Sequence, residues 1–321
     1  MLAVVGVAGT TETGAVDDLQ AIAALCQRYG GIHFHVDAAW GGPLVFSAKH
    51  RPKLRGIALA NSITVDGTAN VCVAAGADEG PRTLMRRRPW STFLACPAAH
   101  AGHKQLYTPM GCGVVLFRDP QLAQSIRKTA SYIIRQESFD AGKFSAEGSR
   151  AANVVYLHAS LSLIGVRGFE ALLDRSTALV QALADRLREM PEFEVAFPPT
   201  TNILLYRWIP RAYRDRLARG ELTPEDQHEI TRQNQALQAL QTQKGQGFVS
   251  RTTIFSPKYR LSLGVLRIVI ANPLVTPAHL VVVLQEQLAL AATLEGDGAA
   301  APPAAAAATA AAALLGRPTS C

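Results

Sequence analysis

The chain has 321 residues, which is enough for one large domain and a smaller one. Its hydrophobic content of 48% is ordinary for a globular protein, and no strongly apolar run of about 18 residues predicts a membrane span. The net charge of +7 suits anionic ligands, but the basic residues are not concentrated enough to indicate nucleic acid binding. Five irregularly spaced cysteines form no disulfide framework, which favours a reducing, cytoplasmic setting.

The first part of the chain alternates apolar runs with a helical repeat. We expect strands over residues 3–8, 32–36, 62–65 and 113–117. A helix capped by Asp17 is expected to end near residue 29. Strands separated by a helix or a long loop favour parallel pairing, so this part predicts a mostly parallel α/β sheet.

The second part of the chain places helices before short strands, which predicts an α+β domain. We expect helices over residues 121–130, 154–165, 169–189, 223–242 and 276–294, and strands over residues 193–197, 202–208 and 265–270.

Two segments in the first part carry chemistry. Asp37 lies at the carboxyl end of an apolar strand, within residues 35–42, and Lys104 follows a second strand, within residues 103–107. Pyridoxal phosphate (PLP) needs such a pair, because the lysine amine forms a Schiff base with its aldehyde and the carboxylate holds the protonated ring nitrogen. Taken alone, Asp37 would be a helix cap or turn residue and Lys104 a surface lysine.

These and further segments resemble the group II PLP-dependent amino acid decarboxylases, which have the aspartate aminotransferase-like fold (fold type I). Within that group the chain is most similar to the glutamate decarboxylase-like and aspartate 1-decarboxylase-like branch. Each motif alone would be weak, but together they span the chain from about residue 3 to residue 290, apart from residues 68–102. The matching segments are residues 9–14, 35–42, 65–67 joined to 103–107, 109–113 and 147–150, Glu194 with 201–204, and Arg267 with 272–273.

The resemblance implies a PLP site. Lys104 would carry the cofactor as a Schiff base, and Asp37 would pair with the pyridine nitrogen. His103 would contact the phosphate, and Thr10 and Ala39 would line the ring pocket.

The resemblance also implies a substrate, a lid and a partner. Arg267 matches the arginine that binds the substrate α-carboxylate, and its place in an apolar strand calls for an anionic partner. Residues 132–150 match the lid that returns a proton, with Tyr132 as the candidate donor. The implied activity is decarboxylation of glutamate or aspartate by a homodimer. Two alternatives stay open: another fold type I PLP reaction, and a catalytically inactive relative.

Residues 68–102 interrupt the lysine motif and show neither a helical nor a strand period. Deleting them restores the uninterrupted Val-Asp-Gly-His-Lys-Gln-Leu-Tyr, and codons for Gly67 and for Ala101-Gly102 can carry intron boundaries in frame. We therefore hypothesise a translated, retained intron that is disordered in the protein. A genuine surface loop is the alternative, since loop length alone costs little entropy.

The expected organisation is a partial large PLP-binding domain, an α+β small domain and a disordered Ala/Pro-rich tail. These cover residues 1–67 with 103–190, residues 191–294 and residues 295–321. Nothing before Thr10 matches the family's N-terminal phosphate-binding turn and ring-stacking histidine, so we expect no turnover by this chain alone.

The histidines of the second predicted strand are not read as metal ligands. His33 and His35 are expected on opposite sides of the strand, with His35 in a pocket or packed. The cysteines and histidines of residues 72–103 lack the ligand spacing of a zinc site, so no metal is predicted.

Overall fold

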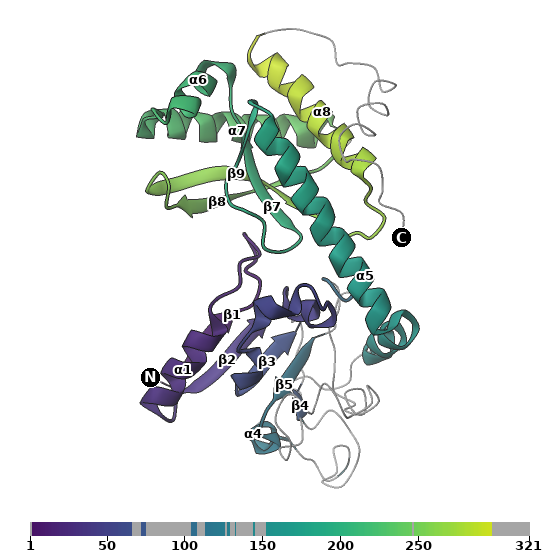
Figure 1. Cartoon of the computed structure of the whole chain (residues 1–321). Helices are drawn as coiled ribbons and strands as arrows, with labels where there is room; N and C mark the ends of the chain where they lie inside the picture. The colour runs from purple at the N-terminus through teal and green to yellow at the C-terminus, as the bar shows by residue number, and fades with distance from the viewer. Residues whose placement is uncertain are drawn as a thin grey trace. The chain divides into compact units, whose positions relative to one another are not determined.

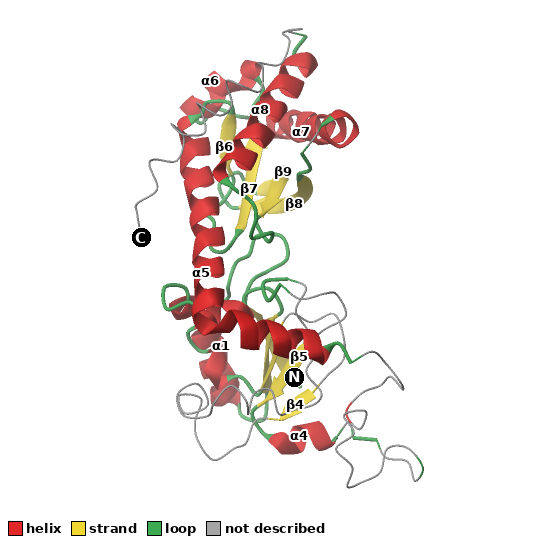
Figure 2. Cartoon of the chain, turned by 90° about the vertical axis from the view of Figure 1, so that its right-hand side faces the viewer, coloured by secondary structure: helices red, strands yellow, loops and turns green. Residues whose placement is uncertain are grey.

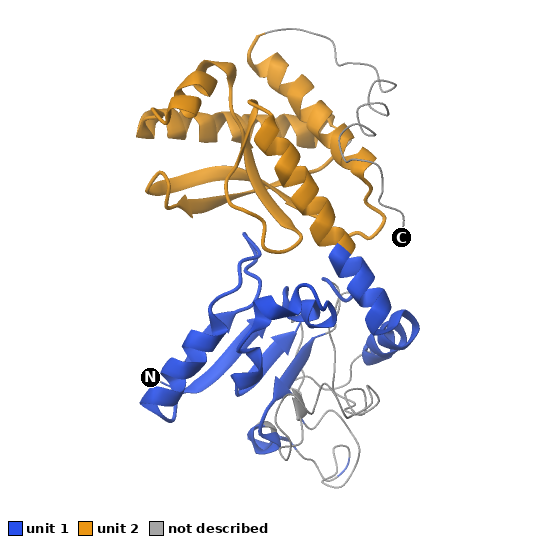
Figure 3. Cartoon of the chain, viewed as in Figure 1, with its two compact units in different colours: residues 1–174 blue, residues 175–321 orange. Residues whose placement is uncertain are grey.

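A computed structural model describes residues 2–65, 72–74, 104–107, 113–125, 127–128, 132, 144, 152–245 and 247–296. The chain divides into two compact units, residues 1–174 and 175–321 (Figure 3). The division falls inside helix α5 (Val154–Glu189), which contributes residues to both units, and lies before the expected boundary at residue 190.

The first unit holds a five-stranded sheet with the order β1-β2-β3-β5-β4 (Figure 1). Strands β1 (Ala3–Val7), β2 (His33–Ala38) and β3 (Ser62–Val65) run parallel, and β5 (Val114–Phe117) runs antiparallel to β3. The predicted mostly parallel α/β sheet is confirmed. The short β4 (Cys72–Ala74) lies within residues 68–102, where no strand was expected, and pairs in parallel with β5.

Helix α1 (Leu19–Tyr29) lies against one face of this sheet (Figure 2). Its Leu19 is fully buried in the same core as Phe34 of β2. A Cβ atom at Gly6 of β1 would lie 2.9 Å from Leu19 Cδ2, so glycine allows the helix to pack this closely.

The cap of α1 differs by one residue from the expectation. Asp18, not Asp17, is the N-cap, and its Oδ1 accepts a hydrogen bond from the Ala21 N–H at 2.9 Å. Asp17 instead accepts from the Val7 N–H through Oδ2 at 2.8 Å, which ties the loop before the helix to the end of β1.

Short helices fill the rest of the first unit. Between β2 and β3 run three 3₁₀ helices, η1 (Gly42–Phe46), η2 (Arg51–Leu54) and η3 (Ile57–Leu59). Helix α4 (Pro120–Gln124) is shorter than the expected helix over residues 121–130.

Helix α5 changes direction at Gly165, whose φ of 65° is non-helical and marks the break expected between two helices. Beyond the kink, Phe169 stacks on Phe46 with ring centroids 5.2 Å apart. One turn later, Asp174 Oδ1 accepts a hydrogen bond from Ser47 Oγ at 2.6 Å. Apolar and polar contacts together therefore hold this part of α5 to the loop after β2.

The second unit holds a four-stranded antiparallel sheet with the order β6-β7-β9-β8. Its α+β composition matches the expectation, but β8 and α6 were not predicted. The elements are β6 (Phe193–Val195), β7 (Ile203–Trp208), α6 (Arg211–Arg219), α7 (Pro224–Lys244), β8 (Ser250–Ser256), β9 (Leu261–Val269) and α8 (Pro277–Leu294).

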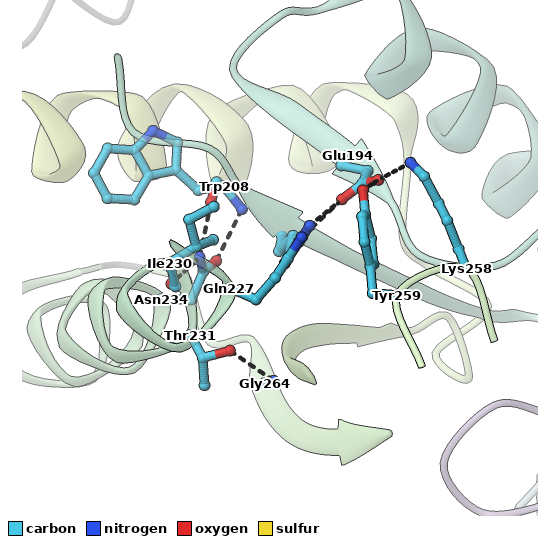
Figure 4. Close-up of polar contacts among 10 residues, drawn as sticks. Glu194, Trp208, Gln227, Ile230, Thr231, Asn234, Lys258, Tyr259 and Gly264 are labelled. Carbon is cyan, nitrogen blue, oxygen red and sulfur yellow. Dashed lines mark hydrogen bonds and ion pairs between the residues drawn. The ribbon is translucent and has the colours of Figure 1, made fainter. Parts of the chain in front are cut away.

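Side chains of α7 complete the hydrogen bonding of two strands (Figure 4). Asn234 Oδ1 accepts from the Trp208 N–H, and Asn234 Nδ2 donates to the Trp208 carbonyl, both at 2.8 Å. Thr231 Oγ1 accepts from the Gly264 N–H at 3.1 Å. These bonds satisfy buried backbone groups and explain why a largely polar helix can pack against a sheet.

Among the described helices, α8 is long and apolar enough to cross a membrane by length and composition. Its Leu280, Leu284 and Ala291 pack in the hydrophobic core of the second unit. Core packing therefore accounts for the apolar residues on the buried side of α8.

The Phe46–Phe169 contact gives a stability prediction. Phe169 is 0% exposed, so Phe169→Ala should lower the free energy of unfolding by about 3–5 kcal/mol through lost burial and a cavity. Leu163→Ala, at a site 86% exposed in the same helix, should change it by less than about 0.5 kcal/mol. Urea unfolding of both variants measures this, and equal losses would contradict the packing described.

Candidate active site

Asp37 is fixed at the carboxyl end of β2. Its carbonyl accepts a hydrogen bond from the Ala8 N–H at 2.7 Å, and its Oδ1 accepts from the Ala39 N–H at 3.0 Å. Among the described residues, its Oδ2 has no hydrogen-bond partner. The side chain is half-buried, so the structure presents an oriented carboxylate with one oxygen available.

The turn after Asp37 is held against the end of β1. The Gly41 N–H donates to the Ala8 carbonyl at 2.8 Å, and a Cβ atom at Gly41 would lie 2.5 Å from that oxygen. Glycine is therefore required at this position. Gly9, with φ of 96°, packs against the same turn, and Thr10 follows it directly.

Gly9 packs against the turn that follows Asp37. Thr10 comes directly after Gly9, and Ala39 lies in that turn. Thr10 Oγ1 is 2.6 Å from Thr13 Oγ1, and the Thr10 N–H donates to the Ala15 carbonyl at 2.9 Å. The loop of Thr10 is thus internally bonded, and Ala39 orients Asp37 through its backbone N–H.

Residues 104–107 form a turn that contacts the Asp37 turn. Gln105 is 1% exposed, and its Nε2 donates to the Trp40 carbonyl at 2.8 Å. Leu106 packs in the core, and Tyr107 has a φ of 55°, unusual for a non-glycine residue. The structure therefore brings the backbone of Lys104 beside the turn that begins at Asp37. His103 lies outside the described residues.

The expectation that His33 and His35 face opposite sides is wrong, because residues two apart on a strand share a face. His33 Nε2 and His35 Nδ1 each lie 2.7 Å from Ser62 Oγ, and His35 Nε2 lies 3.2 Å from Thr64 Oγ1. Burial lowers the pKa of His35 below its ordinary value, His33 lowers it further, and Asp37 opposes the shift. His35 is thus a packed histidine whose neutral form is favoured.

The remaining site residues are not brought together with Asp37 by the described contacts. Tyr132 is 82% exposed, and residues 133–143 of the expected lid lie outside the described residues. Arg267 lies in the second unit, half-buried in β9 and opposite Leu205 of β7. The roles of Tyr132 and Arg267 therefore stay predictions.

Sequence analysis missed the most buried charged side chain among the described residues, Arg207 in β7, which is 0% exposed. Its Nε donates to Glu194 Oε2 at 2.7 Å, and its Nη2 lies 2.5 Å from the same oxygen. Its Nη1 donates to Gln227 Oε1 at 2.5 Å. An arginine within Ile-Leu-Leu-Tyr-Arg-Trp, an apolar strand, gives the same sequence signal as Arg267, and here the anion is Glu194 of the neighbouring strand.

Glu194 joins this arginine to two more side chains. Its Oε1 accepts from Lys258 Nζ at 2.7 Å and from the Tyr259 hydroxyl at 2.6 Å. Burial raises the pKa of Glu194, but the Arg207 guanidinium and the hydrogen bonds from Lys258 and Tyr259 outweigh it, and the net shift is downward. The carboxylate is therefore ionised in the folded unit.

The chemical groups around Asp37 suit the binding of PLP. A carboxylate with one oxygen held by Ala39 and the other available suits a protonated ring nitrogen. The Gln105–Trp40 bond brings the lysine backbone to the same turn. A carboxylate at the carboxyl end of a parallel strand also follows the general rule for sites in open α/β sheets.

Comparison with known proteins places the chain beside a known family and its relatives. The chain matches the pyridoxal-dependent decarboxylase conserved domain over residues 1–78 and 93–208. The interruption, residues 79–92, lies inside the predicted insertion 68–102. Over 297 residues the chain is 36% identical to an aspartate 1-decarboxylase of Aliivibrio fischeri, in a match covering 92% of this chain and 48% of the relative.

Solved structures share the fold. Mouse CSAD in its apo form superposes with a TM-score of 0.71 at 24% identity, covering 90% of this chain and 52% of that one. Oryza sativa TDC with PLP and tryptamine gives a TM-score of 0.68 at 20% identity, covering 91% and 51%. The chain thus spans about half the length of these relatives, and fold type I is confirmed.

The Glu194 network predicts a pH-dependent stability. Because the folded-state pKa of Glu194 is lowered, its stabilisation is complete above the unfolded pKa of about 4.3 and is lost as the pH falls through the folded value. Glu194→Gln leaves the charge of Arg207 buried and unpaired, so it should cost about 3–5 kcal/mol at pH 7.

Unfolding by urea from pH 7 to pH 3 measures this difference, which should shrink below about pH 4. Glu189→Gln removes an exposed partner of Arg186 and should change stability little at any pH. A Glu194→Gln loss that stays constant down to pH 3 would contradict the assignment.

Proposed function

Because this chain belongs to the pyridoxal-dependent decarboxylase family, we propose that it acts in PLP-dependent decarboxylation of a small acidic amino acid, glutamate or aspartate. The observation that carries the proposal is the Gln105–Trp40 hydrogen bond, which joins the Lys104 turn to the Asp37 turn. The two groups that PLP chemistry requires thus belong to adjoining turns of one unit.

The bound cofactor supplies an electron sink for the negative charge left at the substrate Cα when CO2 departs. Asp37, oriented by the Ala39 N–H, keeps a proton on the ring nitrogen, because a nearby carboxylate favours the cationic form. Lys104 supplies the amine that binds the cofactor aldehyde. Thr10 and Ala39 are proposed to line the ring pocket.

The other proposed roles rest on the resemblance. His103 would contact the phosphate, and Arg267 would bind the substrate carboxylate through its planar, bidentate guanidinium. Tyr132 would return a proton to Cα.

The acidic substrate is supported by the aspartate 1-decarboxylase relative at 36% identity. The structural neighbour solved with tryptamine shares only the fold, at 20% identity. A homodimer in the cytoplasm is proposed on the same family grounds.

A catalytically inactive relative is the second candidate. The observation that favours it is the interruption of the family match at residues 79–92, shortly before Lys104. Sequencing the transcript across the codons for residues 66–103 separates the two: a message without codons 68–102 supports the enzyme, and one that keeps them supports the inactive relative.

Covalent capture of PLP tests the roles of the two turns. Borohydride reduction of the chain incubated with PLP should fix the cofactor on the peptide that contains Lys104, as mass spectrometry reads out. Lys104→Ala should abolish this product, and Lys128→Met, at an exposed lysine, should not. Asp37→Asn keeps the oxygen that Ala39 binds but loses the charge, so capture should persist while CO2 release falls by about 10²-fold or more.

Release of labelled CO2 tests the substrate. It is measured on the protein translated from the sequenced transcript, because no turnover is expected of the 321-residue chain alone. Aspartate or glutamate should be turned over in preference to tryptophan. Arg267→Met should raise KM by about 30- to 100-fold, since a charge-assisted bidentate pair is lost. Arg251→Met, an exposed arginine of the neighbouring β8, is the control and should leave KM unchanged. Preference for tryptophan would overturn the acidic assignment.

A further inference from the structure

We propose that Gln105 is a positioning residue that fixes the Lys104 turn on the Asp37 turn through its hydrogen bond to the Trp40 carbonyl. The inference rests on the proposed function, because it assigns Gln105 a purpose only if Lys104 and Asp37 serve the same cofactor.

The bond has ordinary length, a buried donor side chain and a place next to the lysine. Gln105 Nε2 lies 2.8 Å from the Trp40 oxygen, and the side chain is 1% exposed. The buried Gln105 amide is costly to leave without its acceptor, because it has little access to water. Gln105 directly follows Lys104, so the bond restrains the backbone next to the lysine.

The Trp40 end of the bond is rigid. The next residue, Gly41, donates its N–H to the Ala8 carbonyl, and Ala8 donates to the Asp37 carbonyl at 2.7 Å. The closeness of Gly41 to Ala8 leaves no space for a Cβ atom. Gln105 is therefore attached to the backbone segment that carries the Asp37 carboxylate.

The hydrogen bond of Gln105 fixes the orientation of this turn, which apolar packing alone does not do. Leu106 is buried in the core, and burial of apolar surface is non-directional. The amide of Gln105 instead requires a defined donor angle and distance at Trp40. Reaction at a lysine amine depends on placement, and an error of about 1 Å can cost roughly 100-fold in rate.

The test compares rates of PLP capture at Lys104 in the full chain, measured by borohydride fixation and peptide mass. Gln105→Met keeps the volume and removes the donor, so capture should slow by roughly tenfold or more. Gln241→Met is the matched control. Gln241 is also a 1% exposed glutamine with side-chain hydrogen bonds, but it lies in α7 of the second unit. It should lose stability without slowing capture.

A second variant gives a signature that lost stability cannot imitate. In Gln105→Glu, a protonated carboxyl can donate to the Trp40 carbonyl, whereas an ionised one cannot. Burial raises the pKa of such a carboxyl. The ratio of wild-type to variant capture rates should therefore be near one at pH 5–6 and rise to about tenfold at pH 9.

The outcomes separate the two proposals. Absence of capture by the wild-type chain would overturn the proposed function and this inference with it. Capture by the wild-type chain, together with equal rates for Gln105→Met and a flat pH ratio for Gln105→Glu, would overturn this inference alone. Slow capture by Gln105→Met with the predicted pH ratio would support it.

Discussion

The two backbone hydrogen bonds of Ala8 are the contact on which the candidate site depends. The Ala8 N–H binds the Asp37 carbonyl, and the Ala8 carbonyl binds the Gly41 N–H, so the end of β1 holds both ends of the turn that follows β2. Because the backbone of Asp37 is fixed, the N–H of Ala39 can orient the Asp37 carboxylate by donating a hydrogen bond to it. Within the same turn, the Trp40 carbonyl accepts the hydrogen bond from Gln105. The main chain at the ends of two parallel strands thus fixes the position of the candidate catalytic carboxylate.

The chain handles buried charge in two contrasting ways. In the second unit, Arg207 pairs with Glu194, and Lys258, Tyr259 and Gln227 join the network. Within the described residues, Gln227 Nε2 is buried without a hydrogen-bond partner. Such a network defines a unique packing at the price of desolvation. In the first unit, the half-buried carboxylate of Asp37 keeps one oxygen without a hydrogen-bond partner among the described residues.

Much of the fold and part of the site could be predicted from the sequence. The apolar runs of β1, β2 and β3 and the Gly165 break in α5 are local signals, and they were found because propensity and tertiary packing agree there. Strand β8 and helix α6 were missed, since one is a polar edge strand and the other is rich in arginine. The Glu194–Arg207 pair joins neighbouring strands, and partner choice across strands is not a local property of either segment. For the same reason no pattern in the sequence distinguishes Arg207 from Arg267.

The Lys104 turn bears on whether residues 68–102 are compatible with a working site. An insertion before a lysine is damaging if the preceding chain sets the position of that lysine. Two anchors of this turn, however, come after Lys104: the amide of Gln105 on Trp40 and the buried side chain of Leu106. Closing a longer loop costs only about 0.6 kcal/mol for each doubling of its length. A turn anchored from its downstream side can therefore keep its geometry behind a long insertion, and this makes the genuine-loop alternative physically stronger than the sequence alone suggests.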